Sequence, residues 1–87
     1  MAVAYIATTR VVRTGNGVRD RRIVFYHDAE NEVTPFIVHM EVFNEDGWMY
    51  RHRGSYCRTF VDGWQKFITR AHVLLHEEFN NVHQPLP

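Results

Sequence analysis

The sequence lacks several features that would point to a particular class of protein. It contains one cysteine, Cys57, among 87 residues, so no disulfide can form within the chain and a reducing compartment is expected. It also has no basic leader and no long apolar run. We therefore expect neither a signal peptide nor a membrane-spanning helix, and a cytoplasmic location, either in the organism or in an infected host cell.

Motifs typical of enzymes are missing as well. The sequence has no glycine loop that could cradle a phosphate, no nucleophile elbow and no dinucleotide fingerprint. Lys and Arg together number 10, as do Asp and Glu, so net charge gives no reason to expect a nucleic acid or a membrane surface as partner. We expect no cofactor and no metal, and a non-enzymatic protein is favoured over an enzyme.

What is present is the composition of one small globular domain. Hydrophobic residues make up 45% and charged residues 23%, which is typical of a folded chain, and the length leaves no room for a second domain. We predict a single domain over residues 1–81. Residues 82–87 contain two prolines and are predicted to form an extended, flexible tail.

The first third of the chain predicts a β-hairpin. Residues 2–13 are rich in Val, Ile, Thr and Tyr, and a second strand is expected over about residues 19–27. Between them lies Asn16-Gly17, which suits a type I′ turn. With this turn, Arg13 lies opposite Asp20, which is a favourable cross-strand pair.

Residues 35–43 alternate as a third strand does, after a polar connection over residues 28–34. One face of this strand is expected to carry Phe36, Val38, Met40 and Val42, and the other Ile37, His39, Glu41 and Phe43.

The stretch WMYRHRGSYCR, residues 48–58, is interpreted as the fourth strand, and the loop before it decides where its side chains point. A loop of two or four residues would bury two arginines against apolar side chains without a partner. A loop of three residues, with Gly47 as its left-handed residue, avoids this cost. It turns Trp48, Tyr50 and His52 toward the core, and it sets Arg51 opposite Glu41 and Arg53 opposite His39.

From Thr59 onward the apolar residues recur at the period of a helix. Thr59 and Asp62 resemble a capping box, and Asn80-Asn81 is the expected end. The stripe expected to face the sheet comprises Phe60, Trp64, Phe67, Ile68, Ala71, Leu74, Leu75 and Phe79. These segments predict an α+β two-layer sandwich: a four-stranded antiparallel sheet in ββββα order, with one long C-terminal amphipathic helix on one face.

One helix covers one face, and the uncovered face gathers the first candidate site. It is expected to carry the apolar residues Ile37, Phe43 and Met49 beside the polar residues His39, Glu41, Arg51 and Arg53. An exposed apolar patch suggests a homodimer or a protein partner. The polar residues would suit anion binding or acid–base chemistry, with Glu41 orienting His39. A cross-strand salt-bridge ladder is the simpler explanation of the same residues.

Two further groups of residues are candidates for binding. Arginines cluster near the first hairpin, where they suit phosphate or carboxylate groups of a partner: Arg10, Arg13, Arg19, Arg21 and Arg22. His72 and His76 are spaced to chelate zinc on a helix, but the glutamate and the third ligand of such a site are missing from the pattern.

The sequence thus favours a small non-enzymatic binding protein that contacts a protein partner through the uncovered sheet face and the arginine-rich hairpin. In size and in its lack of a catalytic signature it resembles the small accessory proteins of phages and mobile elements, anti-CRISPR inhibitors of host defence systems among them, in type rather than by a shared motif. A nucleic-acid-binding domain that uses the first hairpin is the alternative. A third hypothesis is a small enzyme or anion-binding dimer that uses His39, Glu41 and Arg51.

Overall fold

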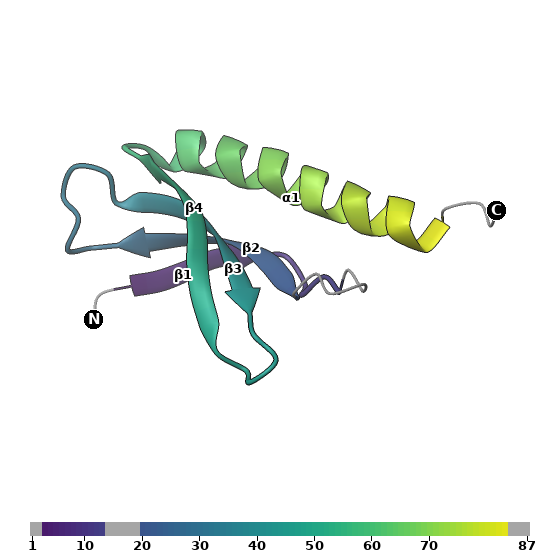
Figure 1. Ribbon diagram of the computed structural model, residues 1–87. Coiled ribbons are helices and arrows are strands. Elements are labelled where there is room, and N and C mark those ends of the chain that lie inside the picture. The colour runs from purple at the N-terminus through teal and green to yellow at the C-terminus, as the bar shows by residue number, and fades with distance from the viewer. Residues whose placement is uncertain (1–2, 14–19, 84–87) are drawn as a thin grey trace.

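The computed structural model describes residues 3–13 and 20–83, the side chains of residues 78–83 excepted. Four strands precede one helix: β1 (Val3–Thr8), β2 (Arg21–Asp28), β3 (Phe36–Phe43), β4 (Met49–Cys57) and α1 (Phe60–His83) (Figure 1). The strands form one sheet in the order β1-β2-β3-β4, and each neighbouring pair is antiparallel. The predicted α+β architecture in ββββα order is confirmed.

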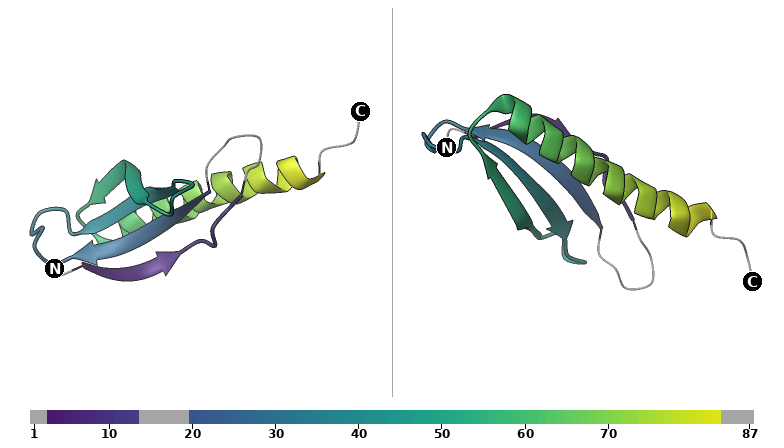
Figure 2. Two further views of the ribbon diagram at one scale, coloured as in Figure 1. Left: turned by 60° about the horizontal axis from the view of Figure 1, so that its bottom comes forward. Right: turned by 90° about the horizontal axis from the view of Figure 1, so that it is seen from above.

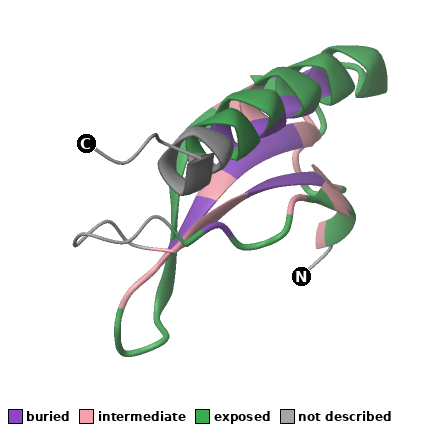
Figure 3. Cartoon of the chain, turned by 90° about the vertical axis from the view of Figure 1, so that its right-hand side faces the viewer, coloured by how far each residue is buried: buried purple, intermediate pink, exposed green. Residues whose placement is uncertain are grey.

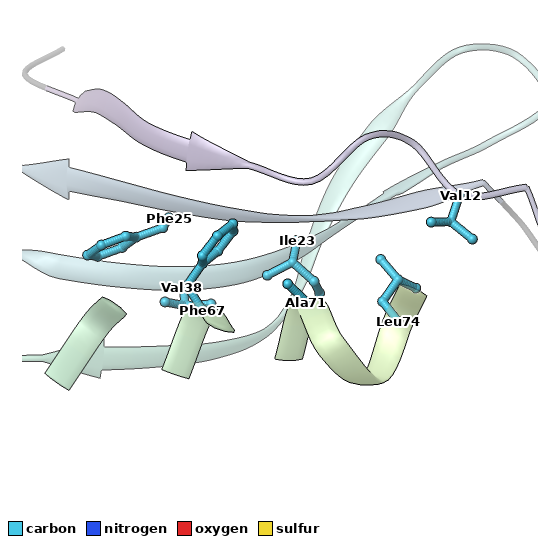
Figure 4. Packing of buried hydrophobic residues seen from close by; sticks show 7 residues of the cluster. All are labelled: Val12, Ile23, Phe25, Val38, Phe67, Ala71 and Leu74. Carbon is cyan, nitrogen blue, oxygen red and sulfur yellow. The ribbon is translucent and has the colours of Figure 1, made fainter. Parts of the chain in front are cut away.

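The helix packs on the sheet through a stripe of apolar side chains, and one phenylalanine of the sheet lies at the centre of this contact. Phe25 of β2 has no exposed surface, and its ring lies 6.2 Å from that of Phe67 on α1. A β-carbon at Gly63 would come within 2.6 Å of the Phe25 ring, so glycine there lets the first turns of α1 approach the sheet closely. The remaining core residues are small aliphatic ones on both layers (Figure 4): Val12, Ile23, Val38, Ala71 and Leu74.

The predicted helix start is confirmed, and the predicted end is too early. The amide of Asp62 donates to the Thr59 hydroxyl at 3.2 Å, as an N-cap requires. The helix runs past Asn80-Asn81 to His83, because asparagine lowers helix propensity only slightly whereas proline, first met at Pro85, breaks a helix. Residues 82 and 83 of the predicted tail are therefore helical. No helix in the described part of the chain has both the length and the apolar character needed to cross a bilayer.

The first hairpin is interrupted where the sequence predicts a continuous strand. β1 ends at Thr8, and the pairing resumes as a single bridge between Val12 and Arg21. At the interruption the Thr9 hydroxyl accepts a hydrogen bond from the amide of Ile23 at 3.0 Å, in place of a backbone carbonyl. The predicted Arg13–Asp20 pair is present, with Nε 3.6 Å from Oδ2. The predicted Asn16-Gly17 turn lies outside the described residues.

The second hairpin follows the predicted register over its outer half. Gly47 has a φ of 83°, and Met40, Glu41 and Val42 pair with His52, Arg51 and Tyr50. The hairpin bends away from α1 (Figure 1), so the prediction that Trp48, Tyr50 and His52 enter the core is wrong. Trp48 and Tyr50 are 74% and 44% exposed, and His52 is exposed as well.

The register of this hairpin shifts opposite His39, and the prediction for Arg53 is wrong there. The pairing of β3 and β4 is irregular between Val38 and Met40, and Arg53 takes a φ of 54°. Gly54 occupies the place beside His39, where a β-carbon would lie 2.4 Å from Nε2. Only glycine fits against this imidazole, so the extra residue of the bulge turns Arg53 toward the helix side of the sheet.

Both faces of the sheet contain buried residues, although the helix covers only one of them. α1 crosses one face (Figure 2), and burial is concentrated between the two layers (Figure 3). On the other face, however, Val24, Tyr26 and Ile37 are also buried and form a second cluster with Val3. The prediction that Ile37 contributes to an exposed patch is wrong, because it is only 2% exposed.

Candidate functional site

Glu41 is the centre of a polar network on the face opposite α1. Its side chain is fully buried, and Oε1 accepts from Arg22 Nε at 2.8 Å and lies 2.7 Å from Nη2 of the same guanidinium. The Tyr5 hydroxyl donates to Oε2 at 2.5 Å, and Arg51 Nε lies 3.6 Å from the same oxygen. A buried carboxylate is tolerated when it is paired and hydrogen-bonded in this way. The network ties all four strands together.

The His39 ring lies beside this network and is held by tyrosines. Nδ1 is 2.8 Å from the Tyr26 hydroxyl, and Nε2 is 3.4 Å from that of Tyr56. Burial, together with the charges of Arg51 and Arg70, lowers the pKa of His39 below its usual value of 6.5. A neutral imidazole has one donor and one acceptor nitrogen, so one tyrosine donates to the ring and the other accepts from it.

The structure brings together three of the four polar residues that the sequence assigned to this face. His39, Glu41 and Arg51 lie on it, whereas Arg53 does not. The prediction that Glu41 orients His39 is wrong, since the two tyrosine hydroxyls occupy both ring nitrogens. Because the polar groups of His39 and Glu41 already have partners within the protein, a salt-bridge ladder explains these residues better than a catalytic site does.

Three members of the network were not among the candidate residues: Tyr5, Tyr26 and Tyr56. Arg22 was a candidate, but as part of the arginine cluster of the first hairpin and not as a partner of Glu41. For Tyr26 a signal was available: side chains alternate along a strand, so Tyr26 lies on the same face as Val24, two residues away. The pairing of Arg22 with Glu41 depends on how β2 and β3 align, which no local pattern in the sequence states.

The arginines of the first hairpin are largely engaged with carboxylates. Arg13 pairs with Asp20, Arg21 with Glu77 at 2.6 Å and Arg22 with Glu41. Arg10 also has an interaction partner, and Arg19 lies outside the described residues. Moreover, Arg21 reaches the helix side while Arg22 reaches the opposite face, so the described arginines do not form one basic ribbon.

A cleft of about 560 Å³ opens between α1 and the β3–β4 hairpin where the hairpin bends away. We call it the α1–β4 cleft. Its floor is apolar and its walls carry three arginines; the lining residues are Ile23, Met40, Val42, Val73 and Leu74, with Arg21, Tyr50, His52, Arg53, Arg70 and Glu77.

Among the described residues, the arginines of the α1–β4 cleft outnumber the carboxylates. Glu77 is the one acidic residue of the described lining, and it is held by Arg21 at 2.6 Å. Arg70 Nη1 donates to the backbone oxygen of Val38 at 3.2 Å, while its Nη2 is buried and has no acceptor among the described residues. Burial and then the charge of Arg53 lower the pKa of Arg70.

A second exposed feature lies on the side of α1 that is turned away from this cleft. Five large apolar side chains, 37% to 60% exposed, follow one another around that side and form what we call the apolar flank: Phe60, Val61, Trp64, Ile68 and Leu75. The prediction that Ile68 and Leu75 are core residues is wrong, since they are 48% and 37% exposed. Trp64 is 40% exposed, but its ring packs against the core, 6.3 Å from that of Phe25 and 5.6 Å from that of Phe67. α1 rests on β2, β3 and β4 and does not approach β1, the edge strand on the far side of β2, so the sheet does not cover this side of the helix.

Two histidines on α1 have the spacing of metal ligands, but they form no metal site with other residues in the described part of the chain. The rings of His72 and His76 are stacked with centroids 6.0 Å apart. No third His, Cys, Asp or Glu of the described residues joins them. Cys57 is buried.

Comparison with known proteins adds no relative: no family model, no curated protein and no solved structure matches the chain.

Proposed function

We propose that the protein is a non-enzymatic binding protein that contacts a protein partner through the apolar flank of α1. The observation that carries this proposal is the exposure of five large apolar side chains along one side of one helix. Contiguous apolar surface rimmed by polar residues is typical of protein interaction sites, and exposed aromatics such as Trp64 are common anchors in interfaces.

The apolar flank suits this role better than the face opposite α1. On that face Ile37 is buried, and both Arg22 and Arg51 are engaged with Glu41. Residues paired within the protein would have to give up those pairs to contact a partner, which costs free energy. The apolar flank needs no such rearrangement.

A binding role also suits the polar residues better than catalysis does. General acid–base chemistry needs a group that can exchange a proton with a substrate. Both nitrogens of His39 are engaged by tyrosine hydroxyls, and the Glu41 carboxylate is fully buried between two arginines. Neither group is free to act on a bound molecule.

The experiment is affinity capture from the native host lysate with three forms of the protein: wild type, Ile68→Glu and Thr69→Glu. Ile68 and Thr69 are both exposed on α1, and successive helical residues point about 100° apart, so the second variant introduces the same charge away from the apolar flank. We expect a protein that wild type and Thr69→Glu retain and Ile68→Glu loses. Identical capture by both variants would contradict the proposal.

Sedimentation of the purified protein distinguishes a second copy from another partner. If wild type and Thr69→Glu sediment as dimers and Ile68→Glu as a monomer, the partner is a second copy of this chain. Capture that disappears on nuclease treatment would favour the nucleic-acid alternative instead. That the partner belongs to a host defence system stays a prediction.

A further inference from the structure

We propose that the α1–β4 cleft is a binding site for a small organic oxyanion. The carboxylate or phosphate of this ligand lies between Arg53 and Arg70. Its apolar part rests on the floor formed by Met40, Val42 and Leu74. This site is separate from the apolar flank, on the opposite side of α1.

Positive charge is in excess in the cleft. Three arginines and one glutamate of the described residues line it, and the glutamate is already bound by Arg21. Among the described residues, no carboxylate lies within ion-pairing distance of Arg53 or Arg70. Two guanidiniums near each other repel one another, and an anion between them would remove that repulsion.

Two arginines that line the cleft have hydrogen-bonding capacity that the protein does not use. Arg70 Nη2 and Arg21 Nε are buried, and neither has an acceptor within the described part of the chain. Buried polar groups nearly always have a partner, and leaving one without a partner costs free energy. An oxyanion supplies several acceptor oxygens, and the planar guanidinium fork suits carboxylate and phosphate in particular.

The backbone of Arg53 adopts an unfavourable conformation. Its φ of 54° is the only positive φ of a non-glycine residue in the described chain, and such conformations cost free energy and concentrate at ligand sites. Regular alternation along β4 would put Arg53 on the face with Arg51. The bulge turns it into the cleft with Arg70 instead, and bulges are known to re-aim side chains in this way.

The size and floor of the cleft select the kind of anion. A volume of about 560 Å³ lies within the usual range for small-molecule sites, and it is far larger than a sulfate or phosphate ion. Apolar surface is supplied by Val73, which is 52% exposed, and by the partly exposed Met40, both of which line the cleft. A ligand that joins an anionic head to an apolar or aromatic body fits both parts.

The test titrates the protein with four compounds at constant ionic strength, followed by ¹⁵N-edited NMR of backbone amides and arginine Nε groups. Benzoate and phenyl phosphate carry the predicted head and body. Inorganic phosphate carries the charge alone, and benzyl alcohol carries the body alone. We expect one or both aromatic anions to shift the Arg53 and Arg70 signals and to bind about tenfold more tightly than either half-ligand.

The two aromatic anions also distinguish a carboxylate site from a phosphate site, according to which of them binds more tightly. Equal binding of benzyl alcohol would overturn the proposal, because the cleft would then be apolar only. Shifts confined to arginines outside the cleft, such as Arg13, would overturn it as well.

Variants complete the test. Arg53→Gly suits the positive φ and should fold, and we expect it to lose at least tenfold in affinity for the aromatic anion. Arg70→Met should lose binding as well. Arg13→Gln is the matched control, because the Arg13 side chain is 86% exposed and outside the cleft, and it should bind as wild type does. Unchanged affinity in Arg53→Gly, with its fold verified by the amide spectrum, would refute the site.

Discussion

Arg53 of β4 and Arg70 of α1 line the same cleft, and burial together with the charge of Arg53 lowers the pKa of Arg70. This arrangement is unfavourable for stability, since two cations approach each other and one of them sits on strained backbone. Proteins retain local strain of this kind mainly where it serves binding or chemistry. Removing the Arg53 side chain should therefore change the stability of the free protein.

Arg53→Gly should stabilise the free protein. Glycine adopts the φ of 54° without strain, and the substitution removes the repulsion of Arg70. These gains outweigh the entropy that glycine adds to the unfolded chain, so we expect the free energy of unfolding to rise by up to about 1 kcal/mol in urea denaturation. His52→Gly is the control. The same substitution one residue earlier, at ordinary φ, should lower stability by about 0.5–1 kcal/mol. A loss of stability in Arg53→Gly would show that Arg53 is held by favourable contacts.

Gly54→Ala should destabilise the protein through one specific contact. Its β-carbon would lie 2.4 Å from His39 Nε2 and 2.9 Å from Tyr56 Cε2, and overpacking of this kind costs about 1–3 kcal/mol. Combining it with His39→Ala removes the obstructing ring. The double variant should then be less destabilised than the sum of the single variants, and strict additivity in denaturation experiments would contradict the account of the bulge.

Glu41→Gln should be among the most damaging single substitutions. It keeps the shape of the side chain but removes the buried countercharge of Arg22 and Arg51, whose own side chains are partly exposed, and this costs about 1–3 kcal/mol. Glu45→Gln, in the exposed loop of the same hairpin, is the control and should change stability by less than about 0.5 kcal/mol. Equal effects of the two substitutions would mean that the Glu41 network contributes little.

His39 should make stability depend on pH in the mildly acidic range. Burial, together with Arg51 and Arg70, lowers its pKa in the folded state below 6.5, so the unfolded chain binds a proton more readily than the folded one. Stability is then complete above this unfolded value and falls as pH decreases from it toward the folded pKa. Denaturation between about pH 5 and 8 should show this slope reduced in His39→Gln and retained in His72→Gln. A slope unchanged in His39→Gln would assign it to other groups.

The sequence predicted those parts of the fold that depend on local chemistry. Gly47 set the loop and therefore the pairing of Arg51 with Glu41, and Thr59 set the start of α1. The position of Arg53 was not predictable in the same way, because the bulge follows from the packing of His39 against Tyr56 across the sheet.

The exposed surfaces were predicted less well than the elements that carry them. The apolar residues of α1 recur at the period of a helix, as predicted. This period does not show how much of the helix the sheet covers. Ile68 and Leu75 are therefore exposed although the period suggests burial. Conversely, Ile37 lies on the face without a helix and is buried by neighbours on that face. Both outcomes depend on the width and twist of the sheet, which only the assembled fold determines.

The most direct test of the proposed function is the affinity of the captured partner for Ile68→Glu and Thr69→Glu, measured with purified components. If the apolar flank is the contact surface, Ile68→Glu should weaken binding at least about tenfold, which corresponds to a loss of about 1.4 kcal/mol, and Thr69→Glu should bind as wild type does. Equal affinity of the two variants would contradict the account.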